Sequence, residues 1–372
     1  MNSTSNDSTL HQEQQRIDIF QLHRIAAPEL LIVDRVITPI WYFIGIIGNI
    51  LSAKIWLSQK MRQSNSSAIY LGAIAVVDLI FIFLHVWMEL LQAYGIGSFN
   101  QPVLCEVFNV LFLCPQYLAP LLILGFTFER FIAICFPFLK ENFCSVKKAF
   151  IAVNILTVIS LLISLMQAYF WTYDELGDAC EIKGYKNTFY TIWTWVSEMV
   201  IFVAVPLIVL VFNILVIREI KKINKFQASF GHDQIRGSNQ TSTVTLLSVS
   251  FYLICTLLPA TIVYAMQMSI TMGNPGTKPA DWSKDPTWST YLIYYHIRRI
   301  VEEICLSNYA CYVFIYCITS AYFRAEVHKL WCLRKAGKYL DCKQTSEENK
   351  VSSTNYCIVK GKSIDKTVPT DV

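Results

Sequence analysis

Charged side chains are scarce in this sequence of 372 residues. Asp, Glu, Lys and Arg make up 16% of it, whereas hydrophobic residues make up 54%. The mean hydropathy is positive, and a soluble protein of this length would be more polar. The chain is therefore a membrane protein. Its net charge of +4 is better explained by cytoplasmic loops than by nucleic acid, which we do not expect as a partner.

The sequence also lacks the signatures of an enzyme. It contains no GxSxG, no HExxH and no GxxxxGK followed by Ser or Thr, and its six histidines are scattered. We therefore expect no catalytic residues, no cofactor and no metal site. A transporter would more often show an internal repeat, and a channel would show a repeated filter-like loop. We find neither, so both classes are less favoured alternatives.

Long apolar runs recur along the chain at lengths that suit a membrane. Crossing the hydrocarbon core of about 30 Å takes about 20 helical residues, and seven runs reach that length. They cover approximately residues 36–57, 68–94, 105–137, 149–171, 188–217, 243–268 and 291–318. We therefore predict an all-α integral membrane protein, with a bundle of seven transmembrane helices in residues 36–319.

The segments on either side of this bundle differ from it. Residues 1–35 lack a positively charged start followed by an apolar core, so we predict an extracellular tail without a cleaved signal peptide. Apolar and basic positions alternate in helical fashion across residues 320–335, which predicts a short amphipathic eighth helix on the membrane surface. Residues 336–372 are expected to form a polar, disordered cytoplasmic tail.

Basic residues set the expected orientation, since the cytoplasmic loops of membrane proteins are rich in Lys and Arg. They gather after the first, third, fifth and seventh runs, and the opposite loops hold few of them. The clearest cases are Lys60, Arg62, Lys140, Lys147, Lys148, Arg218, Lys221, Lys222, Lys225, Arg324 and Lys329. We predict a multi-pass protein of the plasma membrane with its amino terminus outside and its carboxyl terminus in the cytosol. This orientation makes Asn2 and Asn6 candidate glycosylation sites.

Most of the twelve cysteines lie in apolar runs or basic segments. Cys105 and Cys180 are the only two on the predicted outer side, so we expect them to form a disulfide. A cross-link over that span contributes about 4 kcal/mol in the chain-entropy model. Cys332, in the amphipathic segment, is placed for palmitoylation, although such cysteines are unmodified about as often.

Acidic residues within the apolar runs are the sharpest functional clue, because a charge in a membrane span is costly. Asp78 and Glu89 are eleven residues apart in the second run, close to one helical face, with His85 between them. Glu198 in the fifth run and Glu302-Glu303 near the outer end of the seventh fall at about the depth of Glu89. The pattern predicts an acidic pocket that opens outward.

Such a pocket suits a cationic, aromatic ligand if aromatic side chains line its walls. The aromatic candidates are Phe112, Tyr117, Trp193, Trp195 and Tyr264. The acids would add charge-assisted hydrogen bonds. The ligand-binding residues that we predict are Glu89, Phe112, Gln116, Glu198, Tyr264 and Glu302. The alternative is that the acids pair with Arg298, Arg299 or one another only to close the bundle.

Several marks along the chain resemble those of rhodopsin-like (class A) G-protein-coupled receptors, over roughly residues 36–335. In chain order they are Gly48-Asn49, Asp78, Cys105, Glu129-Arg130-Phe131, Cys180, Pro206, Pro259, Tyr316 and Phe323-Arg324. For activation and G-protein coupling, the resemblance implies Glu129, Arg130, Phe131, Pro259 and Tyr316. For a polar core within the membrane, it implies Asn49, Asp78 and Asn308. The implied partners are a heterotrimeric G protein, membrane lipid, arrestin and a receptor kinase.

The sequence departs from this family at several positions. Leu257 replaces the usual Trp two residues before the sixth-helix proline, and Tyr312-Val313 replaces the Asn-Pro pair of the seventh helix. Ala119 stands where a serine commonly helps to bind sodium. Sodium binding at Asp78 is therefore left open.

The ligand class follows partly by exclusion. Aminergic members of the family carry Asp at the position of Phe112, and opsins carry Lys at the position of Leu306. A tail of residues 1–35 is too short for a large hormone-binding ectodomain. The tyrosine-rich, proline-poor seventh helix resembles that of invertebrate receptors for FMRFamide-type and myosuppressin-type peptides, whose ligands end in Arg-Phe-amide. We therefore predict an amidated peptide ligand, with a chemosensory small molecule as the alternative.

Overall fold

The computed structural model describes residues 25, 27–175, 179–183, 188–229, 238–267, 269–274 and 277–331. The chain falls into two compact units, Met1–Ala325 and Glu326–Val372, and the bundle and the sites described below belong to the first. Asn2, Asn6, Cys332 and the predicted tail from residue 336 lie outside the described residues. What the sequence predicts for them stays a prediction.

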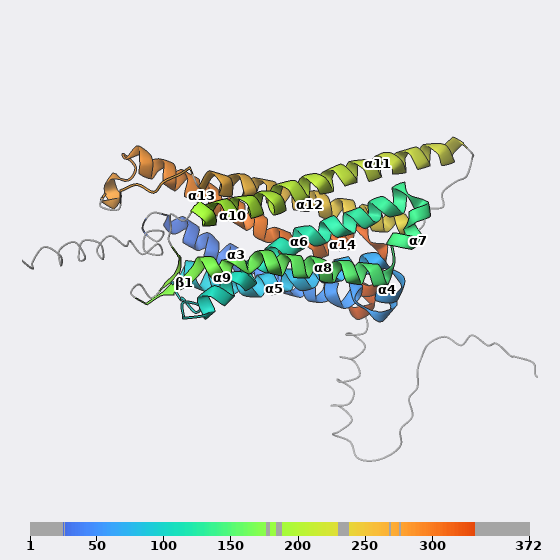
Figure 1. Ribbon diagram of the computed structural model, residues 1–372, viewed down its shortest axis with the longest axis horizontal. Helices are drawn as coiled ribbons and strands as arrows, with labels where there is room; N and C mark the ends of the chain where they lie inside the picture. Colours follow the sequence, from blue (N-terminus) through green and yellow to red (C-terminus); the bar gives the residue numbers. More distant parts are fainter. Residues whose placement is uncertain are drawn as a thin grey trace, which may run out of the picture. The chain divides into compact units, whose positions relative to one another are not determined.

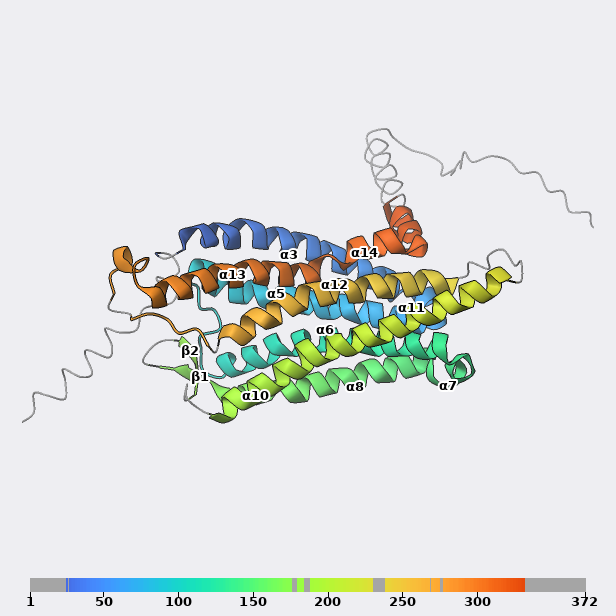
Figure 2. The same cartoon turned by 90° about the horizontal axis from the view of Figure 1, so that it is seen from above.

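Six helices are long and apolar enough to cross a membrane, and a bent pair of helices gives a seventh span. Figures 1 and 2 show the spans running side by side along one axis. In chain order they are α3 (Pro28–Trp56), α5 (Ser66–Tyr94), α6 (Leu104–Cys135), α8 (Val146–Ser164) with α9 (Met166–Phe170), α10 (Thr188–Met199) with η2 (Val200–Ala204) and α11 (Val205–Ser229), α12 (Ser238–Gln267), and α13 (Pro286–Ala310) with α14 (Tyr312–Thr319). The predicted bundle of seven transmembrane helices is confirmed.

The third span, α6, lies at the centre of the bundle, because it contacts α5, α8, α11 and α12. Around it, α3 packs against α5 and α13, and α12 packs against α13. Small residues allow the closest approach, as is usual for helices within membranes. A Cβ atom at Gly48 of α3 would lie only 2.7 Å from Cγ1 of Val313 in α14, so this crossing requires glycine.

The two ends of the bundle carry different short elements. At one end, β1 (Trp171–Asp174) and β2 (Ala179–Ile182) form an antiparallel hairpin in which Tyr173 lies opposite Cys180. At the other end lie α4 (Gln59–Ser64), η1 (Pro137–Leu139) and α7 (Lys140–Phe143) (Figure 1). We call these the disulfide end, after the bridge at Cys180, and the Arg130 end, after the arginine close to the end of α6.

The first helix begins at Pro28, eight residues before the start predicted at residue 36. The prediction is wrong there because Asp34 and Arg35 lower the local hydropathy, and hydropathy was the signal used. In the structure both charges have partners within the bundle. Asp34 lies 2.5 Å from Arg299 of α13, and Arg35 donates to the carbonyl of Ala93 in α5 at 2.8 Å. A paired charge does not interrupt a membrane helix.

The fifth span contains one π-helical turn, η2, just before Pro206. Proline has no N–H, so the carbonyl four residues earlier, that of Phe202, loses its helical hydrogen bond. The hydroxyl of Thr261 in α12 donates to this carbonyl at 3.2 Å. Pro206 therefore creates a polar contact between the fifth and sixth spans.

The seventh span is bent by 50° between α13 and α14, although it was predicted as one run over residues 291–318. The bend lies one turn after Ser307, whose hydroxyl donates to the carbonyl of Ile304 at 2.5 Å. Such back-bonding favours helix bending. Beyond this span residues 321–331 are helical, within the predicted eighth helix, and Phe323 is buried against Trp56 and Tyr316.

Candidate ligand-binding cavity and coupling site

A cavity of about 380 Å³ lies between the helices near the disulfide end. Its walls come from α5, α6, α10, α12 and α13, and Trp171 of the hairpin also lines it. All six residues predicted to bind a ligand line this cavity: Glu89, Phe112, Gln116, Glu198, Tyr264 and Glu302. The predicted helix faces are therefore the ones that meet. Contact of these side chains with a ligand stays a prediction.

Aromatic rings form much of the wall between α5, α6 and α13. The ring of Phe81 lies 3.9 Å from that of Tyr309 and 5.7 Å from that of Phe112, measured between centroids. Phe112 in turn packs 5.7 Å from Phe108. Such offset and tilted pairs are favourable beyond the area that they bury. They give the cavity a stiff apolar side.

Two aromatic residues predicted for this wall do not line the cavity. Trp193 and Trp195 lie on other faces of α10, and Trp195 is 39% exposed. The face of α10 that lines the cavity carries Tyr190, Thr194 and Glu198, which are spaced four residues apart. The prediction for the two tryptophans is wrong because it counted ring content without the rotation of the helix.

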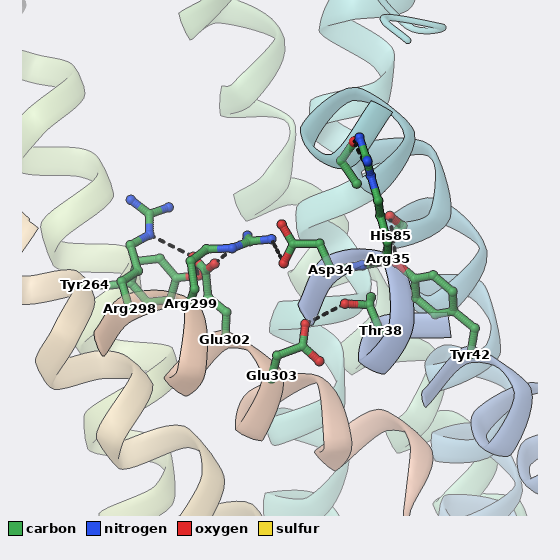
Figure 3. A network of polar contacts seen from close by, with 11 residues as sticks. Asp34, Arg35, Thr38, Tyr42, His85, Tyr264, Arg298, Arg299, Glu302 and Glu303 are labelled. Atoms are coloured by element: carbon green, nitrogen blue, oxygen red, sulfur yellow. Dashed lines mark hydrogen bonds and ion pairs between the residues drawn. The ribbon is translucent and has the colours of Figure 1, made fainter. Parts of the chain in front are cut away.

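Charged and polar side chains from three helices form one network (Figure 3), and several of them line the cavity. Glu302 of α13 accepts hydrogen bonds from Nε of Arg298 at 2.7 Å and Nη1 of Arg299 at 2.8 Å. The hydroxyl of Tyr264 in α12 donates to the same carboxylate at 3.0 Å. Arg299 also pairs with Asp34 of α3 at 2.5 Å. Two arginines and two acids thus balance one another.

One face of α3 also takes part in this network, which was not predicted from the sequence. Asp34, Thr38 and Tyr42 are spaced four residues apart and so share one helical face. Thr38 donates to Glu303 of α13 at 2.6 Å, and the hydroxyl of Tyr42 lies 2.8 Å from Nδ1 of His85 in α5. Figure 3 shows these side chains pointing toward α13 and α5. A polar residue at every fourth position was the signal that could have revealed this face.

The pairing with Arg298 and Arg299 that the alternative requires is present for one predicted ligand-binding acid. Glu302 is paired with both arginines. Glu89 and Glu198 also line the cavity, and neither forms an ion pair with another described residue. The cavity thus holds carboxylates of two kinds, paired and unpaired.

The predicted disulfide is confirmed. Cys105, at the start of α6, is bonded to Cys180 of β2 over a sequence separation of 75 residues, with a Cα–Cα distance of 5.5 Å. Asn109, one turn further along α6, donates to Sγ of Cys180 at 3.3 Å and also lines the cavity. The bridge therefore fixes the hairpin, with its cavity-lining Trp171, against the third span.

At the Arg130 end, Glu129 and Arg130 form an ion pair with a 3.6 Å separation between Oε1 and Nη2. Two consecutive serines at the start of α5 bind this pair: Ser66 donates to Glu129, and Arg130 donates to Ser67. Phe131 stacks against a phenylalanine of α11 with 4.9 Å between centroids. The arginine is thus held between α5 and its own helix, an arrangement that the sequence alone did not reveal.

Comparison with known proteins gives a family for this combination of bundle, disulfide and helix-end arginine. The model of the seven-transmembrane receptors of the rhodopsin family matches residues 48–302, which is more than half of the chain. The chain belongs to this receptor family. The resemblance drawn from the sequence is therefore confirmed.

Several curated receptors of the same family are similar to this one. The growth hormone secretagogue receptor type 1 of Sus scrofa is 22% identical over 218 residues, covering 56% of this chain and 58% of its own. The neuromedin U receptor homolog nmur-2 of Caenorhabditis elegans is 28% identical over 130 residues, covering 34% and 31%. Proteinase-activated receptor 1 of Xenopus laevis is 24% identical over 120 residues, covering 32% and 28%. The chain thus spans less than two thirds of the length of these relatives.

The polar core of this receptor is arranged around tyrosines. Asn49 donates to the carbonyl of Tyr309 at 2.8 Å, and Asn308 accepts from the hydroxyl of Tyr312 at 2.7 Å. Asp78 is fully buried, and neither of its carboxylate oxygens has a hydrogen-bond partner among the described residues. The hydroxyl of Thr256 in α12 also donates to Asn308, at 3.3 Å. Among the described residues, the three predicted polar-core residues therefore bond to the sixth and seventh spans or have no partner, and they do not bond to one another.

Tyr316 and Pro259 are the remaining predicted activation residues of the receptor. Tyr316 is fully buried, 5.5 Å from the ring of Trp56 and 5.5 Å from that of Phe323. Its hydroxyl has no hydrogen-bond partner among the described residues. Pro259 lies inside α12, two residues before Thr261. The roles of both residues in activation stay predictions.

Proposed function

We propose that this receptor resides in the plasma membrane, binds an extracellular peptide in its cavity and activates a heterotrimeric G protein. The disulfide end would face outward and the Arg130 end would face the cytosol. The observation that carries the proposal is the cavity itself: four glutamates and two arginines line it together with aromatic rings. Its formal charge is negative, and its walls are apolar.

An Arg-Phe-amide end fits this chemistry. A guanidinium would pair with a carboxylate through charge-assisted hydrogen bonds, and a phenyl ring would pack against the wall of Phe81, Phe112 and Tyr309. The similar receptors include a neuromedin U receptor homolog and a growth hormone secretagogue receptor, which supports a receptor for an extracellular messenger. A cavity of about 380 Å³ is the size of a small-molecule site. It would therefore hold the end of a peptide, with the remainder outside.

The same contacts suggest how binding reaches the cytosolic side. A ligand shifts a receptor toward the state for which it has the higher affinity. Tyr264 and Pro259 both lie on α12, so a ligand that moves Tyr264 acts on the helix that contains the weak point at Pro259. We expect the ends of α11 and α12 to separate, and Arg130 to leave Glu129 and Ser67 for the G protein. Pro259, Phe131 and Tyr316 would repack during this step.

The test is a calcium or cyclic-nucleotide response in cells that express the receptor, challenged with a panel of amidated peptides. Arg130→Ala should abolish the response and leave peptide binding intact, because Arg130 lies at the other end of the bundle from the cavity. A variant that signals normally would contradict the role of Arg130. Silence of the wild type toward every peptide, with normal surface expression, would favour a small chemosensory molecule, which the size of the cavity also permits.

A further inference from the structure

The glutamates of the cavity differ in how completely their oxygens are used. Oε1 of Glu302 accepts from Arg298 at 2.7 Å and from Tyr264 at 3.0 Å, and Oε2 accepts from Arg299 at 2.8 Å. Arg298 is held further by Tyr264, since its guanidinium lies 5.2 Å from the centre of that ring. Glu302 thus has both oxygens engaged and little capacity for a ligand.

Glu89 is the opposite case. It lines the cavity and is only 5% exposed, yet Oε1 has no hydrogen-bond partner among the described residues. Glu303 is similar in part: Oε1 accepts from Thr38 at 2.6 Å, and Oε2 is buried without a partner in that same part of the chain. Two carboxylates, one on α5 and one on α13, therefore each present an unused oxygen beside the cavity.

The surrounding charges do not compensate these oxygens. The charged groups that act on Glu89 are Asp34, Glu302, Glu303 and Arg299. The guanidinium of Arg299 is already shared between Asp34 and Glu302. Leaving a buried carboxylate without a partner is costly, so these two oxygens favour a bound cation that donates hydrogen bonds to both.

We propose that Glu89 and Glu303 form the cation subsite of this cavity, that its ligand group is a guanidinium, and that Glu302 is a positioning residue. A guanidinium presents five N–H donors in a planar fork and can bond two carboxylates from different helices at once. Glu302 instead holds Arg298, Arg299 and Tyr264 in place. This assignment rests on the proposed peptide function and specifies which acids recognise the ligand.

The experiment compares two probes, Phe-Met-Arg-Phe-amide and the same peptide with citrulline in place of Arg. Citrulline keeps the shape of the side chain and removes its charge. In the wild type, the concentration that gives a half-maximal response should be about 10- to 100-fold higher for the citrulline peptide than for the Arg peptide. This factor corresponds to the loss of one or two charge-assisted hydrogen bonds. Glu89→Gln should raise the half-maximal concentration of the Arg peptide by a similar factor. The half-maximal concentration of the citrulline peptide should stay within about threefold of that for the wild-type receptor.

Two other glutamates of the same cavity give matched controls, since each variant also exchanges a carboxylate for an amide. Glu302→Gln and Glu198→Gln should change the half-maximal concentrations of both peptides by equal factors, because the proposed cation subsite includes neither carboxylate. The assignment is wrong if Glu89→Gln lowers the potency of both peptides equally. It is also wrong if Glu302→Gln or Glu198→Gln lowers the potency of the Arg peptide alone. A wild type that responds to no peptide contradicts the proposed function, and this inference with it. A peptide response without selectivity contradicts only the inference.

Stability without any ligand provides an independent measurement. Glu89→Gln removes a buried carboxyl group whose Oε1 has no hydrogen-bond partner among the described residues, so the melting temperature of the purified receptor in detergent should stay the same or rise. Glu302→Gln leaves two guanidinium groups short of a partner and should lower it. A melting temperature that falls in Glu89→Gln as far as in Glu302→Gln would mean that Glu89 has a structural partner, and would overturn the assignment.

Discussion

Replacing Asp34 by Asn removes the carboxylate from a buried ion pair between α3 and α13. Asp34 lies 2.5 Å from Nη2 of Arg299, and the two side chains are only 3% and 10% exposed. Truncating one partner of such a pair typically costs 3–5 kcal/mol, because the other charge stays buried. Arg299 keeps its 2.8 Å contact with Glu302, so we expect a smaller loss of roughly 2–3 kcal/mol. The melting temperature should fall by roughly 5–10 °C.

The assay is thermal unfolding of the purified receptor in detergent, run as a double-mutant cycle with Asp34→Asn and Arg299→Gln. The double variant should be more stable than the sum of the two single losses predicts, by roughly 1.5–3 kcal/mol. Lys284→Gln is the control, since its 2.8 Å pair with Asp281 is 78% and 51% exposed and should contribute less than about 1 kcal/mol. Strict additivity, or an Asp34→Asn variant as stable as the wild type, would refute the reasoning.

Two further predictions concern the ends of the bundle. Cys105→Ser opens a disulfide with a sequence separation of 75 residues, and we expect a loss of roughly 4 kcal/mol in stability, measured as thermal unfolding and as loss of surface expression. Cys180→Ser should match it, and the double variant should be no worse than either single variant. Ser66→Ala and Ser67→Ala each remove a hydrogen bond that holds the ion pair of Arg130, so signalling without ligand should rise. Unchanged basal signalling in the double serine variant would show that these serines do not restrain the receptor.

Much of the fold could be predicted from the sequence because it depends on hydropathy and helical period alone. A run of about 20 apolar residues specifies a span, and the 3.6-residue period places His85 and Glu89 on one face of α5. Phe112 and Gln116 of α6 are likewise four residues apart and share a face, and all six predicted ligand-binding residues line the cavity. Glu129-Arg130-Phe131 could likewise be found from its order along the chain.

The rest depends on contacts between distant segments, which no local pattern contains. Hydropathy placed the start of the first helix too late, because the pairing of Asp34 with Arg299 cancels a charge that a sliding window counts in full. The pairing state of Glu302 and Glu89 was equally hidden, since the two residues look alike in sequence. Trp193 and Trp195 show the remaining limit: which face of α10 lines the cavity is decided by packing against its neighbours.

The most direct test of the account is guanine-nucleotide exchange by a heterotrimeric G protein, reconstituted with the purified receptor in lipid nanodiscs. We predict that a peptide ending in Arg-Phe-amide accelerates exchange with the wild type. With Arg130→Ala the peptide should still bind, and exchange should stay at its basal rate. If no G protein responds while the same peptide drives an ion current or substrate flux in cells that lack G proteins, the chain works as a channel or transporter and the account is contradicted.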